Sequence, residues 1–328
     1  MFRLFKNPSH QAQFEGDGFV HLPLLEPEDV ERLLAHYVDF SNGGRVVNSA
    51  YGMFISLDAE QLELKRKTIA LIREITLPRL ERYVHDCKSH LGSYLVKVPN
   101  PTSYTNPHQD WTFIDNERMD HYFSMTAWIA LGDYNRDRGS IGFVKGSHRF
   151  FNNVNCSPSP ATRTPTQGLE PVLFRHLTFP EMRAGDAVAF NNKTIHAALP
   201  NGSDVQRIAV GIGLTPLEAV IYHYFLKPGT KDRLLKLKVD EDFFLHYNNE
   251  KFQALWESGR VPDHCTVVGE LPHQLDTMSA QELEERCVQQ ESAADDLGSS
   301  LAAGASAGGA ETSVRQETGR RTGFLKLF

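Results

Sequence analysis

The sequence has no long apolar run, no paired cysteines and no excess of basic charge. None of its 328 residues belongs to an apolar stretch long enough to cross a bilayer, so we expect no membrane span. The start of the chain has neither the apolar core nor the small-residue cleavage site of a secretory signal, which predicts a cytoplasmic protein. The four cysteines form no CxxC pair, which argues against a zinc ribbon and a disulfide framework. A net charge of -7 repels polyanions, so we expect no nucleic-acid partner.

Composition and pattern predict one catalytic domain over residues 1–290 with a disordered tail after it. The tail is rich in Ala, Gly, Ser and Thr, which cannot bury enough apolar surface to offset the entropy lost on ordering. We divide the chain into a helical N-terminal part (24–90), a β core (about 91–216), a mixed C-terminal extension (217–290) and the tail (291–328).

Two helical stretches precede the β core. Pro27 at a first helical position, followed by Glu28 and Asp29 at the positive end of the helix dipole, predicts a helix that runs to about Phe40. Residues 59–90 contain apolar side chains at helical spacing, and Pro78 predicts an interruption there.

The middle of the chain changes to short segments rich in β-branched and aromatic residues, bounded by turn residues. Such segments predict a sandwich or a barrel. They are 93–98, 121–131, 141–146, 186–190 and 207–215. Residues 151–180, rich in Pro, Ser and Thr, predict an irregular excursion that either covers a substrate or is an insertion.

A candidate metal site begins at His108 and Asp110. Residues two apart in a strand point to the same side, so an imidazole and a carboxylate at this spacing can hold one ion together. His196, at the end of a predicted strand, is the candidate third ligand. Two imidazoles and one carboxylate on one face leave coordination positions open, as in non-haem iron(II) oxygenases.

Arg207 stands eleven residues after His196, at the start of an apolar strand. A guanidinium that faces a closed apolar interior needs an anion, and it can hold a carboxylate through two parallel hydrogen bonds. A 2-oxo dicarboxylate has one end for the metal and one for Arg207, so the pattern predicts 2-oxoglutarate as co-substrate, together with iron(II) and O₂.

The chain resembles the phytanoyl-CoA dioxygenase-like (PhyH) family of iron(II)- and 2-oxoglutarate-dependent oxygenases over most of residues 14–215. The motifs that carry the resemblance are FEGDGFVHLPLLEPEDVERL, PHQDWTF, TAWIALGDYNRDRGSIGFVKGSH and AGDAVAFNNKTIHAALPNGSDVQRIAVGIG. The resemblance implies a mainly β fold, a double-stranded β-helix (distorted, cupin-like jelly roll) with flanking N-terminal and C-terminal helices. It matches the metal ligands to His108, Asp110 and His196, the co-substrate clamp to Arg207, and an aromatic of the co-substrate site to Trp128.

Two positions refine what the resemblance implies. Asp110 is retained where halogenating members have a small residue, which favours hydroxylation over halogenation. Ala198 stands where relatives often have a hydroxyl side chain two places after the distal His, so one contact to 2-oxoglutarate is either missing or supplied by another side chain. Gly146-Ser147-His148 matches a strand-end signature that is not a metal ligand.

Three aromatic or imidazole side chains are candidates for the substrate pocket. Trp111 and Phe113 alternate after the metal motif, although aromatics in such a fold are more often core. His223 stands among aromatics, where a structural, hydrogen-bonded role is the usual one. For Lys97 we expect an outward, solvated side chain.

We therefore predict an oxygenase that hydroxylates an unactivated C–H bond of a small organic or acyl-thioester substrate and releases succinate and CO₂. Desaturation, ring closure and epimerisation use the same kind of site and stay open. So do two other classes of protein, a non-catalytic metal-binding jelly roll and a zinc hydrolase with the same three ligands. The sequence does not encode the substrate or the oligomeric state in a readable form.

Overall fold

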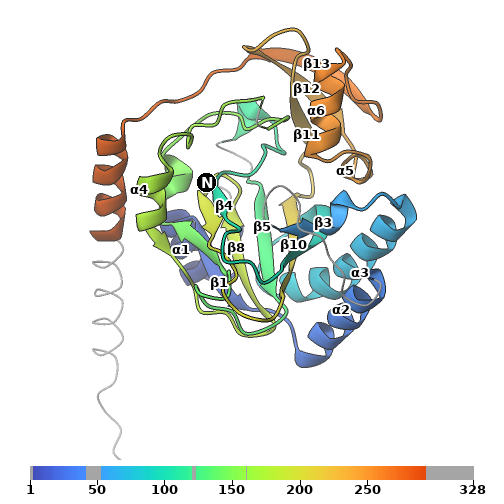
Figure 1. Cartoon of the computed structure of the whole chain (residues 1–328), viewed down its shortest axis with the longest axis vertical. Coiled ribbons are helices and arrows are strands. Elements are labelled where there is room, and N and C mark those ends of the chain that lie inside the picture. Colours follow the sequence, from blue (N-terminus) through green and yellow to red (C-terminus); the bar gives the residue numbers. More distant parts are fainter. Residues whose placement is uncertain (1–2, 42–52, 120–122, 160, 293–328) are drawn as a thin grey trace, which may run out of the picture. The chain divides into compact units, whose positions relative to one another are not determined.

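A computed structural model describes residues 3–41, 53–119, 123–159 and 161–292 of the chain (Figure 1). The chain divides after Glu291, and of the second unit, Ser292–Phe328, only the first residue is described. The predicted disordered tail therefore lies outside the described residues, apart from its first two positions.

The larger sheet has six antiparallel strands in the order β1-β8-β5-β10-β3-β2. Four of the five predicted strand segments belong to it, as β3, β5, β8 and β10. Both faces of its central strands are covered, which explains why their sequences are nearly continuous apolar runs. The bounds are Phe19–Pro23 (β1), Asp186–Asn191 (β8), Met125–Ala130 (β5), Arg207–Pro216 (β10), Cys87–Lys97 (β3) and Phe54–Ile55 (β2).

The smaller sheet has four strands in the order β4-β9-β6-β7. The chain crosses from one sheet to the other between most successive strands from β3 to β10. Side chains of both sheets meet in one apolar cluster, Trp128 and Val188 from the larger sheet with Ile141 and Phe143 from the smaller. This is the predicted jelly roll, so the fold class is confirmed. The bounds are Thr105–His108 (β4), His196–Ala198 (β9), Ile141–Val144 (β6) and Leu177–Thr178 (β7).

Helices α2 (Pro27–Phe40) and α3 (Leu62–Leu80) cover the outer face of the larger sheet (Figure 1). The predicted start of α2 at Pro27 is confirmed, and the Asp29 carboxylate accepts a hydrogen bond from the Glu26 amide. The predicted interruption at Pro78 is wrong. Because the proline lies in the last turn of α3, it removes only one hydrogen bond before the helix ends at Leu80.

The C-terminal extension forms a third sheet in the order β11-β12-β13, with two short helices beside it (Figure 1). Its aromatic side chains pack against Phe113, in the loop that follows the metal motif, so the extension covers that loop. The extension continues into helical residues 280–292, where Leu283 and Cys287 pack against Ile195. The bounds are Tyr222–Leu226 (β11), Arg233–Val239 (β12), Phe243–His246 (α5), Asn249–Glu257 (α6) and Cys265–Pro272 (β13).

Residues 151–180 are more regular than expected, because they include α4 (Glu170–Arg175) and β7. Val172 and Leu173 of α4 bury their side chains beside Ile195, and this packing supports a helix that composition does not predict. The four cysteines are unpaired. Within the described ranges no helix is long and apolar enough to span a membrane. The remaining elements are α1 (Pro8–Asp17) and three short 3-10 turns, η1 (Ser56–Asp58), η2 (Asn116–Arg118) and η3 (Ser147–Arg149).

Candidate metal centre

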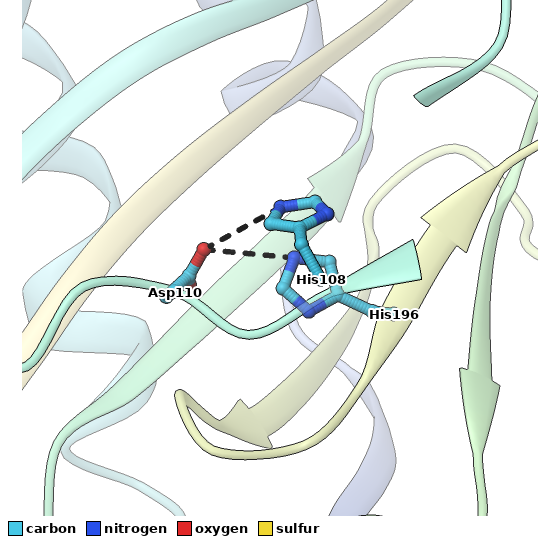
Figure 2. Close-up of side chains that lie close together, drawn as sticks. All are labelled: His108, Asp110 and His196. Carbon is cyan, nitrogen blue, oxygen red and sulfur yellow. Dashed lines mark ion pairs between the residues drawn. The ribbon is translucent and has the colours of Figure 1, made fainter. Parts of the chain in front are cut away.

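The smaller sheet brings the three predicted ligands together. His108 ends β4 and His196 begins β9, and the two residues are direct partners in the antiparallel register. Asp110 follows in the loop, where its amide donates a hydrogen bond of 2.9 Å to the carbonyl of Asn192. One side-chain atom from each of His108, Asp110 and His196 lies within 4.8 Å of the others (Figure 2). Strand pairing therefore places residues 88 positions apart in the sequence at one point.

Both imidazoles are oriented by the backbone. The Nδ1 atom of His108 lies 2.7 Å from the carbonyl of Asn106, and Nδ1 of His196 lies 3.0 Å from the carbonyl of Thr194. A carbonyl only accepts, so both Nδ1 atoms carry the proton and both Nε2 atoms present a lone pair. The two Nε2 atoms face Oδ1 of Asp110, at 3.9 Å from His108 and 3.6 Å from His196 (Figure 2).

The environment keeps His196 neutral. Burial in the barrel, together with the nearby His108 and opposed by Asp110, lowers its pKa to about 4. A neutral imidazole is the form that binds a metal ion. Asp110 is held from the other sheet, because the hydroxyl of Thr126 on β5 donates to its Oδ2 at 3.2 Å. The donor set, two nitrogen atoms and one carboxylate oxygen, suits a divalent transition metal such as iron.

Neighbouring side chains fix the strand that carries His196. The Ser147 hydroxyl donates to the carbonyl of Val144 at 2.6 Å and accepts from the amide of Ile195 at 2.8 Å. The ring of Phe190 lies 4.6 Å from that of His196. His148 has a buried Nδ1 without a hydrogen-bond partner and is not part of the three-residue cluster.

Arg207 lies inside the barrel with only 2% of its surface exposed. Its Nη1 donates to the carbonyl of Leu95 at 3.0 Å, and its guanidinium lies 5.3 Å from the centre of the Trp128 ring. Its Nε is buried without a hydrogen-bond partner. Among the described residues, no carboxylate lies within 4.0 Å of the guanidinium. Burial lowers its pKa to about 10. A buried cation with an unused donor fits an anionic ligand such as a carboxylate.

The three pocket candidates fall into two groups. Trp111 and Phe113 line a cavity of about 30 Å³ beside Asp110, together with Asn192. His223 does not line this cavity. It is fully buried, its Nε2 lies 2.8 Å from the hydroxyl of Ser157, and burial lowers its pKa to about 3.

The expectation that Lys97 points into solvent is wrong. Lys97 has no exposed surface, and it is the register partner of Arg207. The reason is that β3 is covered on both faces, by α3 on one side and by the barrel interior on the other. Leu95 and Lys97 are two residues apart and therefore point to the same side of the strand, which is a weak signal in the sequence that Lys97 faces inward. A lysine at the end of a strand with one exposed face gives the same spacing, so the spacing alone does not decide.

Sequence reasoning also missed Thr126 and Asn192. Thr126 reads as an ordinary strand residue, and only the pairing of the two sheets brings it to Asp110. Asn192 is 4% exposed, and neither its side-chain oxygen nor its side-chain nitrogen has a hydrogen-bond partner. No local motif marks either residue.

Comparison with known protein families gives a match over more than half of the chain. The sequence profile described as "Phytanoyl-CoA dioxygenase (PhyH)" matches residues 14–209. The chain is 26% identical over 133 residues to phytanoyl-CoA dioxygenase domain-containing protein 1 of Mus musculus, covering 39% of this chain and 45% of that protein. For the Rattus norvegicus protein of the same name it is 27% identical over 144 residues, covering 42% and 49%. The chain thus spans about half the length of these curated relatives.

Solved structures show a more distant likeness. The 2-oxoglutarate ("alpha ketoglutarate")-dependent carbocyclase SnoK from nogalamycin biosynthesis is 22% identical with a TM-score of 0.46, covering 66% of this chain and 86% of that one. EvdO2 from Micromonospora carbonacea, in complex with 2-oxoglutarate, is 17% identical with a TM-score of 0.42, covering 64% and 91%. These likenesses are too distant to assign an activity.

Proposed function

Because this chain belongs to the phytanoyl-CoA dioxygenase (PhyH) family, we propose that it is an iron(II)- and 2-oxoglutarate-dependent oxygenase. We propose further that it hydroxylates an unactivated C–H bond of a small organic or acyl-thioester substrate, and that it does so in the cytoplasm. The observation that carries the proposal is the convergence of His108, Asp110 and His196 on one point, with both Nε2 lone pairs facing the carboxylate.

In this proposal His108, Asp110 and His196 hold the iron. When bound, iron together with 2-oxoglutarate and O₂ supplies the oxidising chemistry that converts C–H to C–OH with release of succinate and CO₂. The protein groups orient the reactants. The carbonyl oxygen of Thr194 fixes the His196 tautomer, and the Thr126 hydroxyl fixes the carboxylate of Asp110.

Arg207 and Trp128 are the proposed residues for 2-oxoglutarate. The free Nε of Arg207 and its burial favour a direct, charge-assisted contact to the carboxylate that is distant from the metal. Trp128 lies against the guanidinium and restricts its rotation. Both side chains lie inside the barrel, where water is excluded and such contacts are strong.

The substrate side is proposed at Trp111 and Phe113, next to Asp110. Phe113 is 4% exposed and packs against Phe244, which supports a role for Phe113 in holding the wall of this cavity in place. For His223 we propose support of Trp111 rather than substrate contact, because their rings lie 5.0 Å apart and His223 has no exposed surface.

The first test is turnover of 2-oxoglutarate to succinate by the iron-loaded protein, without substrate and with a metabolite library. We expect slow uncoupled turnover, and a faster rate with a product heavier by one oxygen atom when the substrate is present. Asp110→Ala is expected to lower turnover and iron affinity by at least ~100-fold, since even supporting groups around a metal are worth 10- to 100-fold. Asp242→Ala is the control, because that carboxylate is 54% exposed and pairs with Arg66 on the outside of the barrel.

Two alternatives give different results in the same assay. A non-catalytic metal-binding jelly roll would bind iron in an Asp110-dependent way and show no succinate under any condition. A zinc hydrolase would be active with Zn(II) and not require O₂. Activity with Fe(II) and ascorbate but not with Zn(II) excludes the hydrolase.

A further inference from the structure

Lys97 and Arg207 are two buried cations side by side. They are register partners on β3 and β10, and cross-strand partners point to the same side of a sheet. Lys97 has no exposed surface and Arg207 has 2%. The ammonium of Lys97 donates to the carbonyls of Leu199 at 2.8 Å, Ser103 at 3.0 Å and Ala198 at 3.2 Å. Carbonyl dipoles support a cation, but they do not neutralise it.

Neither cation has a counter-ion in the part of the chain that the structure describes. Arg79, by contrast, has a counter-ion, since its Nε lies 2.8 Å from Oδ2 of Asp29. For Lys97 and Arg207 the charged or titratable neighbours are each other and Tyr134, whose hydroxyl accepts from the Ile208 amide. Burial and the adjacent Arg207 lower the pKa of Lys97 to about 7. A site with two buried positive charges and no negative one is poorly stabilised until an anion enters.

Ala198 locates this pair relative to the metal centre. It lies two residues after His196 on β9, so the two side chains point to the same side of the strand. Its methyl group offers no hydrogen bond, and the Lys97 ammonium bonds to its carbonyl. The Lys97 ammonium therefore bonds to the strand that carries His196, while the Lys97 backbone pairs with the strand that carries Arg207.

We propose that Lys97 is a second cation of the 2-oxoglutarate site, which acts beside Arg207 on the carboxylate distant from the metal. This inference rests on the proposed function. Arg207 provides the direct hydrogen bonds, and Lys97 attracts the carboxylate through its charge. The pair would make the site selective for 2-oxo acids that end in a carboxylate over those of equal length that end in a methyl group.

The test is calorimetric binding of 2-oxoglutarate and of 2-oxopentanoate to the metal-loaded protein without O₂. 2-Oxopentanoate keeps the metal-binding end and replaces the far carboxylate by a methyl group. Lys97→Met is expected to weaken 2-oxoglutarate roughly tenfold or more, because a buried unit charge is removed from the neighbourhood of the carboxylate. It is expected to change 2-oxopentanoate binding by less than about twofold, because that ligand lacks the interacting charge.

Lys65→Met is the matched control. Lys65 is 3% exposed, its ammonium donates to the carbonyls of Leu57 and Leu245, and it lies on α3, outside the barrel. This variant is expected to bind both ligands like the wild type. If Lys97 merely ties Ser103, Ala198 and Leu199 together, Lys97→Met will weaken both ligands by the same factor, and that result overturns the inference.

Proton uptake by the wild type is a second readout that needs no variant. Because an anion raises the pKa of a neighbouring amine, 2-oxoglutarate should bind with uptake of a proton at about pH 8 and with little uptake at about pH 6, where Lys97 is already charged. 2-Oxopentanoate should show no such difference. Equal uptake for both ligands overturns the inference even if Lys97→Met does not fold. Failure of the wild type to bind 2-oxoglutarate at all contradicts the proposed function instead.

Discussion

Two regions of this protein each bury a histidine, and only one of them has the properties of a site. His196 in the barrel and His223 in the C-terminal extension both have a lowered pKa caused mainly by burial. Around His223 the space is closed by rings, with Phe252 stacked at 4.5 Å. Around His196 polar groups converge, with Nε2 facing Asp110.

The difference lies in which polar and charged groups surround each histidine. In the extension, Nε2 of His223 has a partner, the hydroxyl of Ser157, its Nδ1 is buried without one, and the surrounding groups are apolar. In the barrel, the lone pairs of both histidine Nε2 atoms face Asp110, and the Nε of Arg207 is buried without a hydrogen-bond partner among the described residues. Burial of a histidine alone therefore does not indicate function, whereas several polar and charged side chains that converge on one point do.

The largest expected effects come from one phenylalanine in each region. Phe190→Ala and Phe252→Ala each remove a ring that is almost fully buried and touches a histidine, so each should lower the free energy of unfolding by about 3–5 kcal/mol. Only Phe190→Ala should also weaken metal binding, by roughly tenfold, because that ring positions His196. Chemical denaturation and metal titration of both variants measure the two effects. Equal metal affinities would remove the distinction between the regions.

Next comes the hydroxyl that supports the carboxylate. Thr126→Val keeps the shape of the side chain and removes the donor to Asp110, so metal affinity should fall by about 10- to 100-fold. Thr76→Val is the matched control, since its buried hydroxyl donates to the Ile72 carbonyl within α3, outside the barrel. Metal affinity that is the same in both variants would show that Thr126 does not orient the ligand.

The smallest effect is on how the free energy of unfolding depends on pH, and it tests whether His223 is buried and uncharged in the extension. Burial lowers the pKa of His223 to about 3 in the folded protein, against about 6.5 for an ordinary histidine, so the unfolded chain binds an extra proton between those values. Its contribution to stability is complete above pH 6.5 and decreases as the pH falls. His223→Phe should therefore reduce the slope of unfolding free energy against pH by about 1.4 kcal/mol per pH unit between pH 4 and 6, relative to the wild type. Denaturant titrations at several pH values measure that slope, and an unchanged slope would mean that His223 is charged when folded.

Much of the fold could be predicted because its signals are local. The apolar segments at β5, β6, β8 and β10 and the Pro27 start of α2 follow from periodicity and turn chemistry. The continuation of α3 past Pro78 and the formation of α4 could not be predicted. In both segments the local sequence disfavours a helix, and packing against other parts of the chain offsets that cost. The third sheet was missed as well, since its strands depend on pairing with one another and on aromatic contacts to the loop after β4.

The sequence by itself determined which side chains could carry the chemistry. A histidine and an aspartate two residues apart, a later histidine and an arginine eleven residues beyond it are a pattern of residue types and spacing, and spacing along strands fixes the side to which side chains point. Only the tertiary structure decided what surrounds them. It placed Thr126 on Asp110 and turned Lys97 inward beside Arg207, because these contacts arise from the pairing of strands that are far apart in the chain.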